Sequence, residues 1–275
     1  MCAWKPLNRG SSDAGTPARP GYGHAPRAYP AVMALHPNGI NHLAIATRDI
    51  KAQIEFFTDV LGGELKALYW MHGVADTFHG FVELSPTCYI AFQQHPDNNA
   101  EQIIGVTHAG NAGGQTTVGT MQHLALNVDD LDQLLALRDR IRSRGIPVIG
   151  PMDHGMCQSM YFAGPEGLAL EIACGGAIDE RAWIDPEVQA LAGISAEELA
   201  RYVRPPAYER PAQPVPQPPV GDGTLHPVYP PGVFERMAAA PDERMWHAVT
   251  NTPPVHVPVD AAARVPAEVT TAPLP

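Results

Sequence analysis

The sequence predicts an α+β domain built from two βαβββ units in tandem. One phrase occurs twice: residues 41–50 (NHLAIATRDI) return as residues 122–131 (QHLALNVDDL), each with histidine at its second position. Each copy alternates apolar residues with small or polar ones, as a half-buried strand does, and then passes into apolar positions at helical spacing. The two histidines, His42 and His123, are 81 residues apart (123 minus 42). This repetition indicates a duplicated structural unit.

The first unit is expected over about residues 38–95. Asp49 follows the opening strand and suits a helix N-cap, and the glycine pair at 62–63 ends the helix. Three strand-like runs follow the helix. Their expected ranges are 65–70, 78–84 and 87–94.

The second unit, about residues 119–176, repeats this plan. Asp129 or Asp130 caps its helix, and Gly145 ends it. A Gly-Pro-Glu-Gly turn at 164–167 separates the last two strands. The expected strand ranges are 147–149, 158–162 and 168–174. The two units, with a Gly-, Asn- and Thr-rich connector over about 98–120, make up one domain over residues 36–176.

Composition changes at both ends of the chain. Residues 1–35 are rich in Gly, Pro, Ser and Ala and are expected to form a disordered arm, with Met33 as a candidate second start. Two short helices are expected over 177–204, where Pro186 suits a first helical turn and Ser195 with Glu198 makes a capping box. Residues 205–275 hold 17 of the 29 prolines, so a disordered or extended tail with almost no regular structure is expected.

Charge and cysteine usage restrict the classes of partner. Lys and Arg number 18 against 29 Asp and Glu, a net charge of -11, and no long basic run occurs, so neither nucleic acid nor an anionic membrane is expected as a partner. No apolar run is long enough to cross a bilayer, and residues 1–30 lack the apolar stretch of a signal peptide. Four cysteines without CxxC spacing indicate reduced thiols and a cytoplasmic location.

Strand parity places one ligand-type residue on a face of each of three strands. His42, His123 and Glu171 have mainly small neighbours on their own face, whereas the opposite face of each strand is aliphatic. Small neighbours leave room for a metal ion, water and substrate. In any one of these strands, the polar residue could simply lie on a face exposed to solvent. Three of them within one repeat favour a metal site.

This tandem repeat, with histidines on the opening strands and a glutamate on the closing strand, resembles the vicinal oxygen chelate superfamily. That group contains glyoxalase I, methylmalonyl-CoA epimerase, fosfomycin-resistance proteins and extradiol ring-cleaving dioxygenases. The resemblance covers about residues 38–176. It implies a cupped mixed sheet around one divalent metal held by His42, His123 and Glu171. We expect a homo-oligomer, such as a dimer.

The fourth ligand position of this superfamily differs among its enzymes. Matching residues 90–92 (Ile-Ala-Phe) to residues 170–172 (Leu-Glu-Ile) puts Ala91 there, where glyoxalase-like and epimerase-like enzymes usually carry Glu, Gln or His. Gln93 lies on the same face two residues later and is the alternative if the strand is shifted. With Ala91 the ligands form the 2-His-1-carboxylate triad of non-haem Fe(II) oxygenases, so Fe(II) is favoured over Mn, Zn, Ni or Co.

The residue order before the last strand also resembles that of the extradiol enzymes. Tyr161, the turn at 164–167 and Glu171 follow the order Tyr, Pro-x-Gly and Glu, in which the tyrosine helps to hold a substrate oxygen at the metal. This makes Tyr161 a candidate substrate contact, although aromatic residues are also ordinary strand residues. His154, in a loop near the mouth of the cup, and His79, on the third strand of the first unit, are candidates for proton transfer.

The leading prediction is therefore an oxidoreductase: a dioxygenase that uses Fe(II) and O2 on a small catechol-like aromatic diol. The alternative is an isomerase or lyase of the glyoxalase or epimerase type, in which a divalent metal stabilises an enediolate. The third option is a non-catalytic small-molecule binder, because bleomycin-resistance proteins use the same fold without metal chemistry. The three good ligands argue against that third option.

Overall fold

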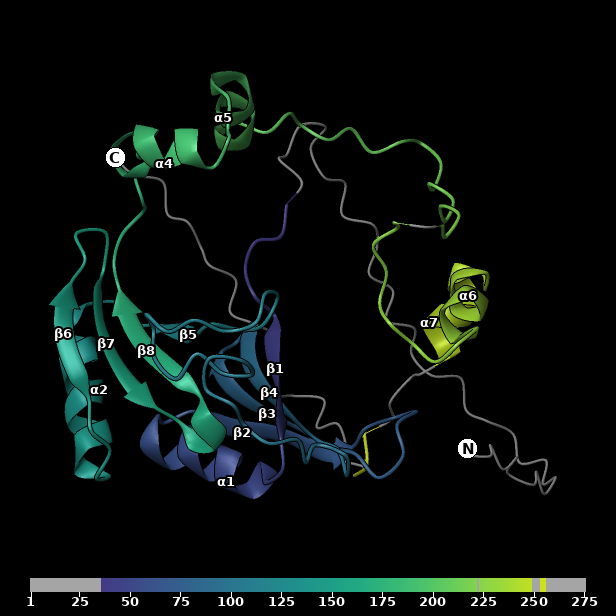
Figure 1. Ribbon diagram of the computed structural model, residues 1–275. Helices are drawn as coiled ribbons and strands as arrows, with labels where there is room; N and C mark the ends of the chain where they lie inside the picture. Colours follow the sequence, from purple (N-terminus) through teal and green to yellow (C-terminus); the bar gives the residue numbers. More distant parts are fainter. Residues whose placement is uncertain (1–35, 222, 249–252, 256–275) are drawn as a thin grey trace, which may run out of the picture.

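Two four-stranded mixed sheets, each backed by a helix, lie together at the lower left of Figure 1. The computed structural model describes residues 36–221, 223–248 and 253–255. The arm predicted over residues 1–35 lies outside the described residues. Each sheet comes from one predicted unit, so the prediction of tandem βαβββ units in an α+β fold is confirmed.

The first unit opens with β1 (His42–Thr47) and a helix. Asp49 caps α1 (Ile50–Glu55) as predicted, because its side chain accepts a hydrogen bond from the Ala52 N–H, and a π-helical turn, η1 (Phe56–Val60), continues the helix. The remaining strands are β2 (Glu64–Trp70), β3 (Phe78–Ser85) and β4 (Cys88–Gln94). The sheet order is β1-β4-β3-β2, with β1 and β4 parallel.

The second unit has the same order of elements. Asp130, not Asp129, caps its helix by accepting from the Gln133 N–H at 2.8 Å. The elements are β5 (Leu124–Asn127), α2 (Leu131–Ser143), β6 (Ile149–Asp153), β7 (Gln158–Ala163), the 3-10 turn η2 (Pro165–Gly167) and β8 (Ala169–Cys174). The order β5-β8-β7-β6 matches that of the first sheet, so β1 and β5 are both edge strands.

The two units share one hydrophobic core. The rings of Phe56, from η1, and Phe162, from β7, stack with centroids 6.5 Å apart across the junction. Arg140 of α2 donates to the carbonyl oxygens of residues 58–60 at the end of η1. Because burial alternates along β1, with Ile45 buried and His42 exposed, the histidine-bearing face points away from this core.

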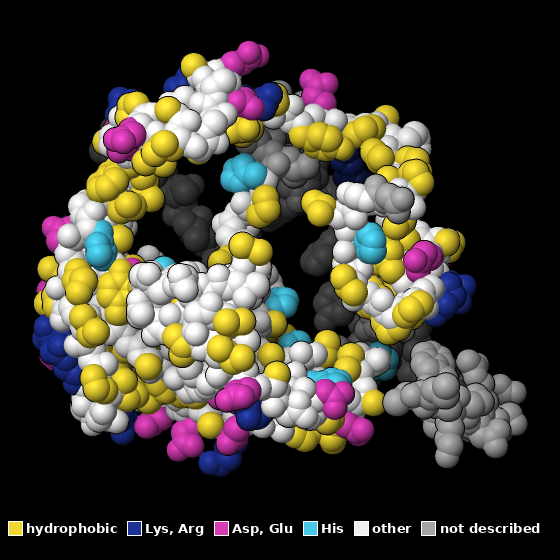
Figure 2. Space-filling model, in the orientation of Figure 1, with side chains coloured by type: hydrophobic (Ala, Val, Ile, Leu, Met, Phe, Trp, Pro, Cys, Tyr) yellow, Lys and Arg dark blue, Asp and Glu magenta, His cyan; other side chains and the backbone are white. Residues whose placement is uncertain are grey.

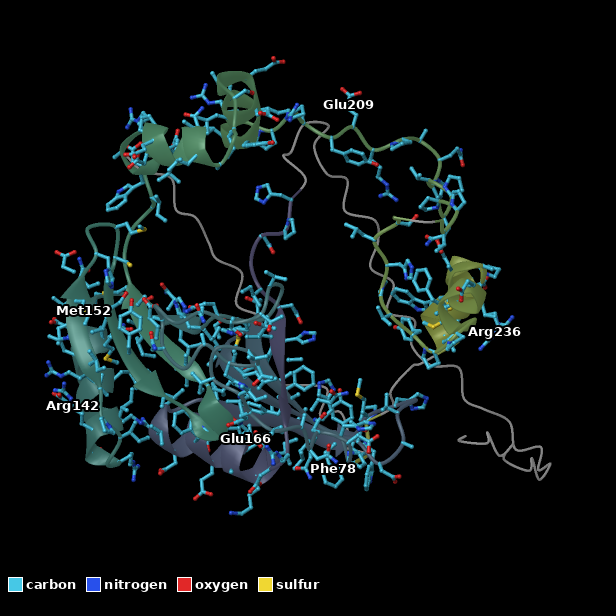
Figure 3. The ribbon with its side chains drawn as sticks, in the orientation of Figure 1. Phe78, Arg142, Met152, Glu166, Glu209 and Arg236 are labelled. Atoms are coloured by element: carbon cyan, nitrogen blue, oxygen red, sulfur yellow. The ribbon has the colours of Figure 1, made fainter. Side chains whose placement is uncertain are left out.

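Glu166 joins the two units from the turn between β7 and β8 (Figure 3). Its carboxylate accepts hydrogen bonds from Thr47 Oγ1 (2.6 Å), the Arg48 N–H (2.8 Å) and Gln53 Nε2 (2.9 Å), all in the first unit. Burial raises the pKa of Glu166, but these hydrogen bonds and the charge of Arg48 outweigh it and hold the pKa below its usual value. The carboxylate therefore remains ionised while it ties the end of β1 and the buried Gln53 to the second unit.

Three short helices, not two, follow the second sheet. They are α3 (Glu180–Trp183), α4 (Pro186–Leu191) and α5 (Ala196–Val203); the Pro186 start and the Ser195–Glu198 capping box are confirmed. Figures 1 and 2 show α4 and α5 standing away from the sheets. Within the described residues, no helix is long and apolar enough to span a membrane.

The prediction of almost no regular structure after Arg204 is wrong in two places. The described part of the tail contains α6 (Val233–Ala238) and α7 (Asp242–Ala248). Neither helix contains a proline, and Pro241 lies immediately before α7, where a missing N–H costs nothing. Short proline-free stretches rich in Ala, Glu, Arg and Met therefore form helices even in a proline-rich segment.

Candidate functional site

Strand pairing places Ala91 and Glu171 at equivalent positions of the two sheets. Ala44 of β1 lies opposite Ala91 of β4, and Ala125 of β5 lies opposite Glu171 of β8. The register that sequence matching predicts is therefore the register observed. Ala91 is fully buried, and its methyl group offers no donor atom to a metal.

The alternative of Gln93 as a fourth ligand does not agree with this register. Gln93 lies opposite Ala46, four residues beyond His42, which is about 13 Å along the strand. Its Nε2 lies 3.5 Å from the Met71 sulfur, and its partner on β3 is His79. The strand shift that would bring Gln93 to the ligand position is absent.

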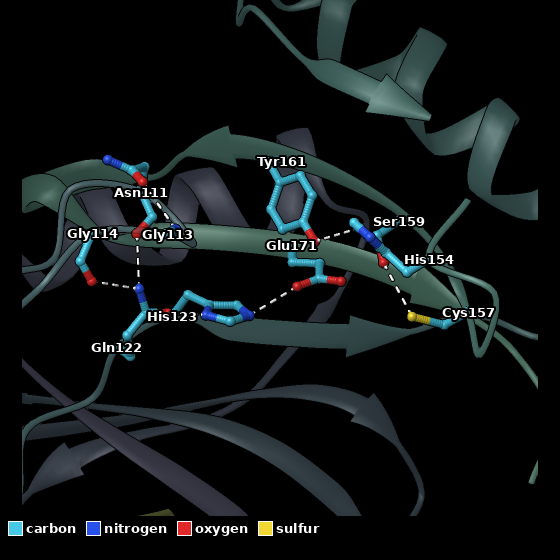
Figure 4. Close-up of polar contacts among 10 residues, drawn as sticks. All are labelled: Asn111, Gly113, Gly114, Gln122, His123, His154, Cys157, Ser159, Tyr161 and Glu171. Carbon is cyan, nitrogen blue, oxygen red and sulfur yellow. Dashed lines mark hydrogen bonds and ion pairs between the residues drawn. The ribbon is translucent and has the colours of Figure 1, made fainter. Parts of the chain in front are cut away.

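His123 and Glu171 meet on the second sheet (Figure 4). His123 Nε2 lies 2.9 Å from Glu171 Oε2, and the glutamate is only 6% exposed. Tyr161 of β7 lies opposite Glu171, with its ring centroid 6.4 Å from that of His123. Burial and the negative charge of Glu171 raise the pKa of Tyr161, so its phenol keeps its proton at neutral pH.

His154 extends this cluster from the loop between β6 and β7. Its Nε2 lies 3.0 Å from Tyr161 Oη. The loop is a tight turn, in which the His154 N–H donates to the Cys157 carbonyl oxygen. Four of the predicted site residues therefore lie together on the second unit. They are His123, His154, Tyr161 and Glu171.

The first sheet carries a mainly aromatic face at the corresponding place. The Phe81 ring lies 5.5 Å from that of His42 and 4.6 Å from that of His79. Tyr69 stacks on Phe81 at 6.3 Å, and its hydroxyl lies 3.4 Å from His79 Nδ1. Burial, and then the charge of His42, lower the pKa of His79, so this imidazole is neutral at pH 7.

Within one chain the three predicted metal ligands do not converge. In the ranges that the structure describes, no group of three or more His, Cys, Asp or Glu side chains is placed to hold a metal ion. His123 and Glu171 bring an imidazole nitrogen and a buried carboxylate oxygen together, and this donor chemistry fits a divalent metal. His42 lies on the other sheet. The full ligand set stays a prediction.

Sequence reasoning missed two residues that contact the histidines. Asn41 Oδ1 lies 2.8 Å from His42 Nδ1, and Gln122 Oε1 contacts His123 Nδ1. The signal was present in the repeated phrase, since an amide residue precedes the histidine in each copy. It could have been read from the rule that a ligand histidine needs a partner for its second ring nitrogen.

A family model with the description Glyoxalase/Bleomycin resistance protein/Dioxygenase superfamily matches residues 39–172. The matched range covers the two βαβββ units, apart from the last two residues of β8, and the connector between them. The domain belongs to this superfamily. The resemblance to the vicinal oxygen chelate superfamily is therefore confirmed, and individual members of such a superfamily still differ in the reaction they carry out.

Two curated proteins and one solved structure illustrate the likeness. The uncharacterized protein YwbC of Bacillus subtilis (strain 168) is 29% identical over 133 residues, 48% of this chain and 94% of YwbC. Biphenyl-2,3-diol 1,2-dioxygenase 2 of Rhodococcus globerulus is 24% identical over 131 residues, 48% of this chain but only 60% of that enzyme. A glyoxylase/bleomycin resistance protein/dioxygenase domain from Frankia sp. EAN1pec matches with a TM-score of 0.42 and 16% identity, covering 51% of this chain and 100% of that one.

Proposed function

We propose that this protein is a dioxygenase that cleaves a catechol-like ring with Fe(II) and O2. The observation that carries the proposal is Ala91, which stands without a donor atom where the second sheet has Glu171. Two histidines and one carboxylate would hold the metal and leave three ligand positions open, enough for two substrate oxygens and O2. A fourth protein ligand would leave only two, which suits an enediolate but not a diol together with O2.

The second sheet would supply the polar groups of the reaction. The bound metal would stabilise developing charge and hold both reactants in contact. The protonated phenol of Tyr161 would donate a hydrogen bond to a substrate oxygen, and His154 would accept or return a proton at Tyr161 Oη, 3.0 Å away. His79, which is neutral at pH 7, is the corresponding proton acceptor on the first sheet.

The complete ligand set would require a second copy of the chain. His42 lies on one sheet and the His123–Glu171 pair on the other, and β1 and β5 each have one unpaired edge. We infer a dimer in which His42 of one copy completes the pair of the other. The aromatic face of the first sheet, with Phe81 at its centre, would then form a wall for a planar substrate. A two-fold dimer would contain two such sites.

The likeness to an enzyme named for biphenyl-2,3-diol supports this substrate class. The test is oxygen-electrode assay of anaerobically prepared, Fe(II)-loaded protein with a panel of catechols. We expect O2 uptake with a yellow ring-cleavage product, and none with His123→Ala. His36→Ala, which changes an exposed histidine outside both sheets, is the control. No uptake with any catechol, alongside isomerisation of a hemithioacetal or epimerisation of an acyl thioester with Ni(II) or Co(II), would replace this function by the isomerase or lyase alternative.

Mixing two inactive variants tests the shared site separately. His42→Ala and Glu171→Ala should each be inactive alone. In a mixed dimer one site loses both residues and the other loses neither, so random mixing should restore about a quarter of the wild-type activity. A site contained within one chain would show no recovery.

A further inference from the structure

Gln122 holds its amide between the connector and the His123 ring (Figure 4). Its Nε2 donates to the carbonyl oxygens of Asn111 at 3.0 Å and Gly114 at 2.9 Å, which uses both amide protons. The other end of the amide, Oε1, contacts His123 Nδ1. An amide oxygen only accepts hydrogen bonds, so a hydrogen bond in this contact requires a proton on Nδ1.

The connector fixes the two carbonyl groups that orient this amide. Asn111 Oδ1 accepts from the Gly113 N–H at 2.9 Å, and the Gly114 N–H donates to the Asn111 carbonyl oxygen at 3.0 Å. A Cβ atom on Gly114 would lie 2.1 Å from the carbonyl oxygen of Ala109, which is itself buried. Only glycine allows this close approach of two backbone segments. The backbone therefore determines which end of the Gln122 amide faces the ring.

Glu171 competes with Gln122 for the proton of the same ring. Its Oε2 lies 2.9 Å from His123 Nε2, and an ionised carboxylate is also only an acceptor. A neutral imidazole has one N–H, and a proton on Nε2 would leave that nitrogen without a lone pair for a metal. By accepting from Nδ1, Gln122 opposes this outcome and keeps Nε2 available.

The first unit contains the same arrangement. Asn41 Oδ1 lies 2.8 Å from His42 Nδ1, so an adjacent amide contacts the same ring nitrogen in both units. Asparagine is one methylene shorter than glutamine, and the contact forms with either. This amide–histidine contact is present in both units, although the other residues on the histidine-bearing faces of the two sheets differ.

We propose that Gln122, and Asn41 in the first unit, are positioning residues that place the imidazole proton on Nδ1 of the adjacent histidine and leave Nε2 as the metal-facing donor. The metal-facing part rests on the proposed function. The position of the proton is a property of the chain itself and is measurable without metal.

The decisive measurement is a long-range proton–nitrogen NMR spectrum of full-length protein with 15N-labelled histidine. At pH about 8 an ordinary imidazole is neutral, and the spectrum shows which nitrogen is protonated. We expect a proton on Nδ1 of His123 in the wild type. Gln122→Met keeps the length but loses the acceptor, so the proton should move to Nε2, beside Glu171. A wild-type His123 protonated on Nε2 alone, or no change in Gln122→Met, would overturn the inference.

Two further variants separate the acceptor from general structural effects. Gln122→Asn carries the amide that the first unit uses, and it should keep the proton on Nδ1; the same change as in Gln122→Met would overturn the role given to the amide oxygen. Gln115→Met alters an exposed glutamine of the same connector and should leave the His123 signal unchanged. Circular dichroism checks that every variant is folded.

Zinc affinity, measured by competition with a chelator, tests the consequence for the metal. Gln122→Met should bind zinc about 10- to 100-fold more weakly than the wild type, the usual cost of losing a partner of a ligand histidine. Zinc binding that is unchanged in Gln122→Met would overturn the metal-facing part. If the wild type binds no metal but the proton still moves in Gln122→Met, the proposed function fails and the role of Gln122 in placing the proton is supported.

Discussion

The two units have one backbone plan but different chemistry on the same face. In the first sheet Phe81 lies opposite Ala91, and at the equivalent place in the second sheet Tyr161 lies opposite Glu171. The first pair is apolar, whereas the second offers a phenol and a carboxylate. Because alternate residues of each strand face the core, the site face is free to diverge without disturbing the packing that both units need.

The histidine and its amide partner are what the two faces have in common. His42 contacts Asn41 and His123 contacts Gln122 through the same ring nitrogen. An oriented histidine is thus present twice, and a buried carboxylate beside it is present once. A site assembled from one face of each unit needs this combination, with two imidazoles, one carboxylate and an apolar wall.

The largest effect is expected when the second face is made to resemble the first. Glu171→Ala introduces the residue of the equivalent position 91 and removes one of the three proposed ligands. Loss of a residue that only supports a metal ligand lowers metal affinity by up to about 100-fold. Loss of a ligand itself should lower the affinity by more than that. Metal content after dialysis, together with calorimetric titration, measures this. Glu187→Ala, at an exposed position in α4, is the control. Full metal content in Glu171→Ala would remove Glu171 from the ligand set.

Tyr161→Phe removes the hydroxyl group from the other residue of the Tyr161–Glu171 pair. Turnover should fall about 100-fold, the scale of one proton-transferring group, while metal content stays unchanged because the phenol is outside the ligand set. His154→Gln should have a smaller effect. Because His154 acts through Tyr161 Oη, the double variant should lose little more than Tyr161→Phe alone. Initial rates of O2 uptake measure turnover in the two single variants and the double variant. If the double variant loses the full sum of the two single effects on activation free energy, His154 acts by a route that does not involve Tyr161.

The repeat and its local signals were predictable from the sequence because they depend on neighbouring residues. Asp49 caps the first helix as predicted, and matching residues 90–92 to residues 170–172 puts Ala91 at the position of Glu171, which agrees with the observed strand registers. The tail was less predictable. An average proline content over residues 205–275 conceals proline-free stretches long enough for one or two helical turns, as in α6 and α7.

The relation between the two faces was not predictable from either unit alone. Parity shows which residues share a face, but whether two units close around a common site depends on contacts between residues far apart in the chain. Here Phe56 stacks on Phe162, and Arg140 binds the end of η1. These contacts join the core sides of the units, and among the described residues of one chain His42 forms no metal-binding group with the His123–Glu171 pair.

Replacing the Glu166 carboxylate tests how the two units are joined. Glu166→Gln keeps the shape, but an amide nitrogen cannot accept a hydrogen bond. In place of Oε2 it would lose the bonds from Thr47 and Gln53, and in place of Oε1 the bond from the Arg48 N–H, so the free energy of unfolding should fall by about 1–3 kcal/mol at pH 7. The folded-state pKa of Glu166 is lowered, so this stabilisation is complete above the ordinary value of 4.5 and is lost as pH falls through the folded value. Urea unfolding should show that wild type and Glu166→Gln differ less in their free energy of unfolding at low pH than at pH 7. Glu187→Gln is the control, and a difference independent of pH would contradict this role of the carboxylate.

The smallest expected effect concerns His79, on the aromatic face. Burial, and then the charge of His42, lower the folded-state pKa of His79 below 6.5, so the neutral ring stabilises the fold fully above pH 6.5 and this stabilisation is lost as pH falls through the lower folded value. His79→Gln removes the titrating group. The wild type should therefore lose slightly more stability than His79→Gln between pH 7.5 and about pH 5.

Thermal unfolding across this pH range measures the difference between wild type and His79→Gln. His36→Gln, which changes an exposed ring near the Pro37 carbonyl, is the matched control and should follow the wild type. His42→Gln should weaken the pH dependence without abolishing it, because burial is the larger cause of the lowered pKa and the charge of His42 the smaller one. If wild type and His79→Gln lose stability in parallel, the aromatic face does not hold its histidine neutral, and proton transfer would be left to His154 on the second sheet.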